Sequence, residues 1–133
     1  MIKAYIDAST KGNPGPSGGG IDLTTPNDHL QLSFPLPQSS NHQAEFACFI
    51  HLLDFLLEQQ WQQQTIMVYT DSKVVAQTID KNHTNNSDFQ PYLAEIQERL
   101  TSFSLLIVQW VPESKNKGAD NLARQGLQKA LKL

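Results

Sequence analysis

The sequence predicts one α/β domain over residues 1–133, in which helices cover both faces of a mixed five-stranded sheet. Three observations lead to this prediction. Short apolar segments separated by turn residues fill the first third of the chain, as in a hairpin meander. Apolar segments then alternate with segments of helical periodicity, as in βαβ units. A chain of this length can bury its own core, and no repeat or linker divides it. The expected order is β-β-β-α-β-α-α-β-α.

The meander is expected to contain three strands, at residues 2–8, 21–24 and 29–34. The segment 10–20 is rich in Gly and Pro, so it is predicted to be a turn. The segment Pro26–Asp28 is predicted to join the second and third strands as a hairpin. Pro35 and Pro37 are expected to end the meander.

Four helices should follow, and each is expected to start at a residue that can cap it: Ser40, Ser72, Asp88 and Asn116. Ser40 and Gln43 have the spacing of a capping box. Pro91 falls in the first turn of the third helix, where its missing N–H does no harm. The two remaining strands are expected at residues 65–70 and 105–111.

The composition excludes several classes of protein. No apolar run is long enough to span a membrane. Cys48 is the only cysteine, so no intrachain disulfide forms, and we expect no signal peptide before the first strand. The reducing cytoplasm is therefore the expected compartment, and a monomer is the default expectation. The net charge of −3 argues against a protein that holds nucleic acid by charge alone. Half of the basic residues nevertheless lie close to acidic motifs: Lys11, Lys73, Lys115, Lys117 and Arg124.

Four acidic residues stand at the ends of separate predicted elements: Asp7, Glu45, Asp71 and Asp120. Asp7 and Asp71 follow strands that are expected to be adjacent and parallel. Glu45 and Asp120 are expected in the first turns of helices, so all four can reach one edge of the sheet. Carboxylates gathered there repel one another and raise each other's pKa values. Their convergence therefore favours a pair of divalent cations about 3.5–4 Å apart, which is typical of enzymes that cut phosphodiesters.

No other catalytic pattern is present. The chain has no nucleophile elbow, no Cys/His spacing suited to zinc and no P-loop ending. We therefore expect no small-molecule cofactor.

The motifs around the four acids resemble those of the ribonuclease HI family, in its compact bacterial form. The matching residues are Asp7 with Gly12–Gly15, Asn41 with Glu45, Thr70–Ser72, and Asn116 with Asp120, Leu122 and Ala123. The resemblance covers residues 2–127, nearly the whole chain. It implies that residues 1–133 form a single domain with the ribonuclease H-like fold.

By this resemblance the protein is a ribonuclease H, an endonuclease that hydrolyses the RNA strand of RNA/DNA hybrids and leaves 5′-phosphate and 3′-hydroxyl ends. The four acids are then both the catalytic and the metal-binding residues, and they hold two Mg²⁺ or Mn²⁺ ions, with Asp7 bridging the two. The resemblance also implies contacts to the hybrid from six polar residues: Asn13, Ser40, Asn41, Ser72, Lys73 and Asn116. The 2′-hydroxyl is the group that distinguishes RNA from DNA at such a site.

Three features depart from the family's pattern. Ala8 replaces the Gly that often follows the first Asp. The segment 110–115 lacks the family's loop His, and Glu113 and Lys115 are the candidates to replace it. The loop 82–87 carries no basic protrusion, which predicts weaker hybrid binding and a shallower salt dependence.

These departures leave two alternatives open. One is a weakly active or non-catalytic module that binds nucleic acid or a protein on the same fold. The other is an enzyme with the same metal chemistry that acts on a different nucleic acid, such as double-stranded RNA.

Overall fold

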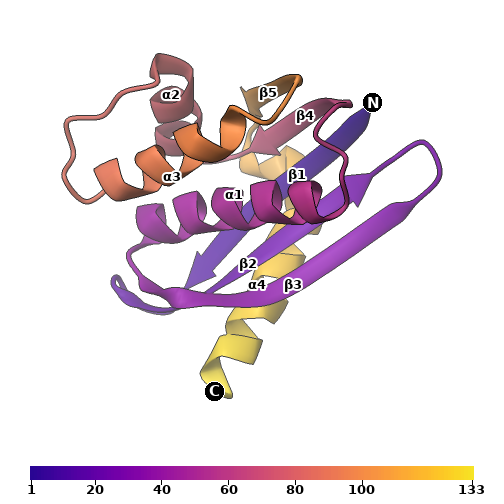
Figure 1. Ribbon diagram of the computed structural model, residues 1–133. Helices are drawn as coiled ribbons and strands as arrows, with labels where there is room; N and C mark the ends of the chain where they lie inside the picture. Colours follow the sequence, from indigo (N-terminus) through magenta and orange to yellow (C-terminus); the bar gives the residue numbers. More distant parts are fainter.

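A computed structural model describes all 133 residues and confirms the predicted fold class. One mixed sheet has the strand order β3-β2-β1-β4-β5, and helices lie on both of its faces (Figure 1). The strands are β1 (Ile2–Thr10), β2 (Gly15–Thr24), β3 (His29–Ser39), β4 (Thr65–Thr70) and β5 (Leu105–Trp110). The helices are α1 (Asn41–Glu58), α2 (Lys73–Lys81), α3 (Gln90–Leu100) and α4 (Lys117–Leu131), with a short 3₁₀ turn, η1 (Glu113–Lys115), before α4.

The central strand β1 joins two halves of the sheet that differ in direction. It pairs antiparallel with β2, which pairs antiparallel with β3. On its other side it pairs parallel with β4, which pairs parallel with β5. The last parallel pair of β1 and β4 is Ile6 with Thr70. Asp7 in β1 and Asp71 directly after β4 are therefore neighbours at the carboxyl end of this parallel pair.

The core lies mainly between α1 and the sheet, while α4 crosses the opposite face (Figure 1). Phe46, Phe49 and Leu52 of α1 are fully buried in one cluster with Ile6 and Val68 of the sheet. The third helix, α3, packs on α1 rather than on the strands. None of the helices has the length and apolar character that crossing a membrane requires.

The glycine-rich segment is a strand for half of its length, so its prediction as a turn was wrong there. Residues 15–20 are the first six of the ten residues of β2. A Cβ atom at Gly18 would lie 2.0 Å from Leu127 N, and one at Gly20 would lie 2.4 Å from Ala123 N, both in the backbone of α4. Glycine in this strand allows α4 to approach the sheet closely. The tight packing of α4, and not a turn, is what requires these glycines.

The prediction that Pro35 and Pro37 end the meander was also wrong. The third strand continues through both prolines to Ser39. Because β3 is an edge strand, one side of its backbone has no strand partner, and proline is tolerated in such strands.

The predicted cap positions are confirmed for three of the four helices, and the side chain caps the helix at two of them. Ser40 forms the predicted capping box with Gln43, and the Ser72 side chain accepts a hydrogen bond from the Val75 N–H. The cap of α3 is Phe89, so the prediction of Asp88 was wrong by one residue, and no side chain caps this helix. Asn116 occupies the cap position of α4, but its side chain makes no capping hydrogen bond. That side chain is used elsewhere, as described below.

Candidate active site

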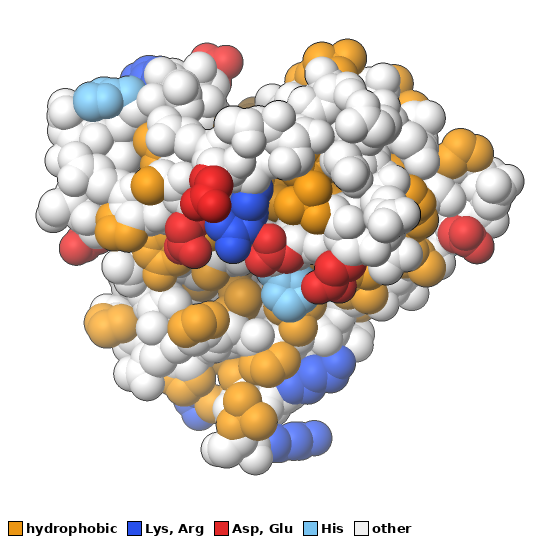
Figure 2. Space-filling model, in the orientation of Figure 1, with side chains coloured by type: hydrophobic (Ala, Val, Ile, Leu, Met, Phe, Trp, Pro, Cys, Tyr) orange, Lys and Arg blue, Asp and Glu red, His pale blue; other side chains and the backbone are white.

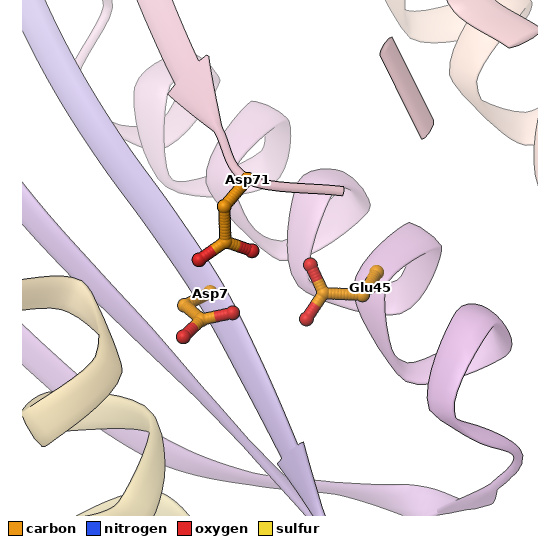
Figure 3. A group of neighbouring side chains, drawn as sticks. All are labelled: Asp7, Glu45 and Asp71. Atoms are coloured by element: carbon orange, nitrogen blue, oxygen red, sulfur yellow. The ribbon is translucent and has the colours of Figure 1, made fainter. Parts of the chain in front are cut away.

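Three carboxylates lie together at the edge of the sheet where β1 and β4 run parallel (Figure 3). Asp7 belongs to β1, Asp71 directly follows β4, and Glu45 projects from α1. Their carboxylate oxygens lie within 4.8 Å of one another. Two details differ from the sequence prediction. The first strand continues past Asp7 to Thr10, and Glu45 lies beyond the first turn of α1, which begins at Asn41.

Fixed hydrogen bonds hold these carboxylates in place. The Ala8 N–H donates to Asp7 Oδ1 at 2.9 Å and to Glu45 Oε1 at 2.7 Å, so one backbone group joins two acids. The Asn116 side chain donates from Nδ2 to Asp71 Oδ2 at 3.2 Å and to the Ile6 carbonyl at 2.9 Å. Ala8 makes this contact with its backbone, so the methyl group that replaces the family's glycine does not remove it.

Burial and the charges of neighbouring acids raise the pKa values of all three carboxylates. For Asp7, burial is the main cause and the Asp71 charge adds to it, which raises the pKa to about 7. Burial also raises the pKa of Glu45 well above its usual range, and the Asp7 charge adds to this effect. Burial raises the pKa of Asp71, the hydrogen bond from Asn116 opposes the rise, and the Glu113 charge supports it. Burial and neighbouring negative charge therefore disfavour the ionised form of all three groups, and added positive charge would favour it.

The protein itself does not supply that positive charge. None of the three carboxylates forms an ion pair with a Lys, Arg or His side chain. Carboxylate oxygens are the preferred ligands of hard divalent cations such as Mg²⁺ and Mn²⁺. A cluster of one buried and two half-buried carboxylates without a basic partner therefore fits a divalent cation, and this cluster could hold one.

Asp120 lines the same cavity as the three acids but is not part of their cluster. It lies in the first turn of α4, as predicted. Its Oδ2 atom lies 3.1 Å from Nη2 of Arg124, which lines the cavity as well. The fold thus brings all four predicted acids to one cavity, three of them in direct proximity and the fourth beside an arginine.

Glu113 is a fifth acid in this cavity, although the sequence singled it out only as a candidate to replace the loop His. It belongs to η1, which links β5 to α4. Its position depends on where the turn after β5 lies relative to the other acids, and no local pattern reports this. The other candidate, Lys115, lines a different cavity with Tyr5 and Asp22.

The six residues predicted to contact a hybrid fall into two groups. Three line a second cavity beside the acids: Asn41, Ser72 and Lys73. Asn13 lies next to it, since its Oδ1 accepts the Asn41 N–H at 3.0 Å. Ser40 precedes Asn41 and uses its hydroxyl to cap α1. Asn116 differs from the others, because it is 1% exposed and its side chain supports Asp71 from below the surface.

Basic side chains do not form a continuous patch on the face that carries α1 and α3 (Figure 2). Arg99 of α3 is used in ion pairs with Asp54 at 2.6 Å and Glu95 at 3.8 Å. The pair with Asp54 joins α3 to α1, the pair with Glu95 lies within α3, and together they leave the Arg99 charge balanced. The absence of a basic protrusion in the sequence is therefore not offset by a basic surface on this face.

Comparison with known proteins places the chain in a family. The family model described as "Reverse transcriptase-like" matches residues 5–132. The chain is 51% identical over 129 residues to the protein named "Putative hydrolase EbsB" of Enterococcus faecalis, covering 97% of this chain and 96% of that protein. It is 29% identical over 145 residues to the ribonuclease H of Bradyrhizobium diazoefficiens, covering 98% of this chain and 92% of that protein.

Solved structures of the same fold agree with this. Ribonuclease H1 of Halobacterium salinarum matches with a TM-score of 0.86 and 27% identity, covering 97% of this chain and 98% of that one. LC11-RNase H1 in complex with an RNA/DNA hybrid matches with a TM-score of 0.88 at 24% identity, covering 98% of this chain and 99% of that one, which shows a shared fold. The chain belongs to the reverse transcriptase-like family, and within it to the ribonuclease H class of hydrolases.

Proposed function

We propose that this protein is an endonuclease that hydrolyses the RNA strand of RNA/DNA hybrids and leaves 5′-phosphate and 3′-hydroxyl ends. The observation that carries the proposal is the cluster of Asp7, which is buried, with Glu45 and Asp71, which are half-buried, at the end of the parallel strands and without a basic partner. Similarity to ribonucleases H at 27–29% identity supports the substrate class. On the same fold, LC11-RNase H1 binds an RNA/DNA hybrid.

The residues that would hold two Mg²⁺ or Mn²⁺ ions are Asp7, Glu45, Asp71 and Asp120. The chemistry that such ions supply when bound is a more acidic attacking water and a neutralised charge on the leaving 3′ oxygen. The chain's own contribution is to hold the carboxylates in fixed positions. The Ala8 N–H fixes Asp7 and Glu45, and Asn116 fixes Asp71, so the carboxylates need no rearrangement to act together.

The cavity beside the acids offers the groups that a hybrid needs. Asn41 provides an amide, Ser72 a hydroxyl and Lys73 an ammonium group. The Ser72 oxygen accepts the Val75 N–H at 3.2 Å, which leaves its own hydroxyl hydrogen free to donate. Donors of this kind suit 2′-hydroxyls and phosphate oxygens.

One sheet with one main core supports the proposal that residues 1–133 act as a single domain. We propose a monomer as its working state. The single, buried and unpaired Cys48 is consistent with the cytoplasm as its compartment.

The test is a cleavage assay on a labelled RNA/DNA hybrid with Mg²⁺ or Mn²⁺, next to RNA duplex and DNA duplex controls. We expect cutting of the RNA strand of the hybrid only, and only with a divalent ion. Cutting of the RNA duplex instead would show that the substrate is double-stranded RNA and not the hybrid. Binding of hybrid without cutting, under either ion, would favour the non-catalytic alternative.

A further inference from the structure

Trp110 connects two parts of the proposed site, although no motif draws attention to it. It is the last residue of β5 and is 40% exposed. Its indole Nε1–H donates to the Asp71 carbonyl at 3.0 Å. The face of the same ring lies 4.9 Å from the Lys73 ammonium nitrogen. One exposed side chain therefore contacts both the backbone carbonyl of an acidic residue of the cluster and a cation of the adjoining cavity.

The hydrogen bond adds to the contacts of Asn116 and Thr70 that hold a short connection in place. Asp71 lies between the end of β4 and Ser72, the cap of α2. The Val111 N–H donates to the Thr70 carbonyl at 2.8 Å, which completes the pairing of β4 with β5. The Asp71 carbonyl comes one residue later, beyond the ladder, and receives the indole N–H instead. Trp110 thereby extends the rigid sheet by one residue, to the residue that carries the carboxylate.

The ring also determines where the Lys73 charge lies. Lys73 forms no ion pair with any acid, although Asp71 is only two residues away. An ammonium group over an indole face is attracted by the electrons of the ring. This contact holds a positive charge at the cavity that contains Asn41 and Ser72, without using it to neutralise the acid cluster. A cation held there can meet a phosphate group of a nucleic acid strand.

We propose that Trp110 is a positioning residue with two separable effects. Its N–H keeps Asp71 in place for metal binding and cleavage, and its ring keeps Lys73 in place as a phosphate contact. This inference rests on the proposed function, but it also predicts effects on metal binding and on fluorescence that do not depend on cleavage.

Two variants separate the two effects in steady-state cleavage of the hybrid. Trp110→Phe keeps a ring under Lys73 but loses the N–H, so kcat should fall by about two- to tenfold with KM little changed. Lys73→Met keeps the hydrogen bond but loses the charge, so KM should rise, and the slope of log affinity against log salt should become shallower by about 1. In the Trp110→Ala background, Lys73→Met should raise KM less than it does in the wild type. The reason is that the Lys73 ammonium group has already lost the ring that holds it at the cavity.

Metal binding gives a readout without turnover. Calorimetric titration with Mn²⁺ should show weaker binding to Trp110→Phe by about two- to tenfold, and unchanged binding to Lys73→Met. If the wild type binds Mn²⁺ but does not cut the hybrid, the proposed function fails while this titration still decides the role of Trp110 at Asp71.

Trp61 provides a matched control, because it is the only other tryptophan and packs against Phe55. Trp61→Phe makes the same chemical change away from the acids and should leave kcat and Mn²⁺ affinity unchanged. It also makes Trp110 the only indole, so Lys73→Met in that background should alter the emission. The proposal is overturned if Trp110→Phe matches Trp61→Phe in kcat and Mn²⁺ affinity, or if Lys73→Met leaves the Trp110 emission unchanged.

Discussion

The acids of this cavity differ in burial and in whether a basic side chain balances their negative charge. Asp7 is 7% exposed, lies against Glu45 and Asp71, and has a pKa raised by burial to about 7. Asp120 has a side chain that is 37% exposed and an arginine partner one helical turn away. The cluster of three therefore costs the fold free energy unless a cation binds, whereas Asp120 is already compensated. The three carboxylates whose ionisation destabilises the fold are therefore the ones that depend most on a bound ion.

The largest expected effect concerns cleavage. Asp71→Asn removes an oxygen ligand from the cluster and should reduce cleavage of the hybrid by on the order of 10³-fold. Asp120→Asn should reduce it less, by about tenfold, because Asp120 stands outside the cluster of three. Circular dichroism should show both variants folded. Equal losses in the two variants would remove the distinction between the cluster and Asp120.

The next effect is the pH dependence of stability in the metal-free protein. The unfolded chain releases the Asp7 proton near its ordinary pKa of 3.8, whereas the folded protein keeps it until about pH 7. The contribution of Asp7 to the free energy of unfolding is therefore fully present below about pH 4. It is lost as the pH rises to about 7, by roughly 2–4 kcal/mol.

Urea unfolding in the presence of a chelator between pH 4 and pH 8 measures this loss. Asp7→Asn should make the loss smaller, because it removes one titrating group, while Glu45 and Asp71 remain with pKa values that burial raises. Asp120→Asn should leave the profile as it is in the wild type. A wild-type stability that rises across this range would contradict the raised pKa of Asp7.

Divalent ions should reverse that loss. A ligand that binds only the folded state at a hundred times its Kd stabilises a protein by about 2.7 kcal/mol. Mg²⁺ should therefore raise the Tm of the wild type at pH 8, with NaCl of equal ionic strength as the control. Asp71→Asn should lose most of this increase and Asp120→Asn only part of it. An unchanged Tm at tens of millimolar Mg²⁺ would contradict a metal site in the cluster.

The smallest effect is expected at Arg124. Its pair with Asp120 is an exposed contact between residues four apart on one helix, and such pairs contribute about 0.3–0.5 kcal/mol. Arg124→Gln should lower the free energy of unfolding by no more than this amount, as measured by urea unfolding at pH 7. A much larger loss would show that Asp120 depends on its partner as strongly as Asp71 depends on Asn116.

Much of this arrangement could be predicted from the sequence, because its signals are local. Ser40 and Gln43 lie three residues apart, and their capping box depends only on the geometry of one helical turn. The order of strands and helices follows from apolar periodicity in the same way. The four acids could be named because each stands at the end of an element that such patterns define.

Only the tertiary structure decided which distant groups meet. Asn116 was predicted to contact a hybrid, yet its side chain lies under the surface and joins Ile6, 110 residues away, to Asp71. Gly18 and Gly20 have the composition of a turn but form a strand, because α4 packs against them. Glu113 and Trp110 reach the acids through the packing of β5 and η1. Local sequence determines backbone conformation within a few residues, whereas contacts between distant residues depend on how complete elements pack against one another.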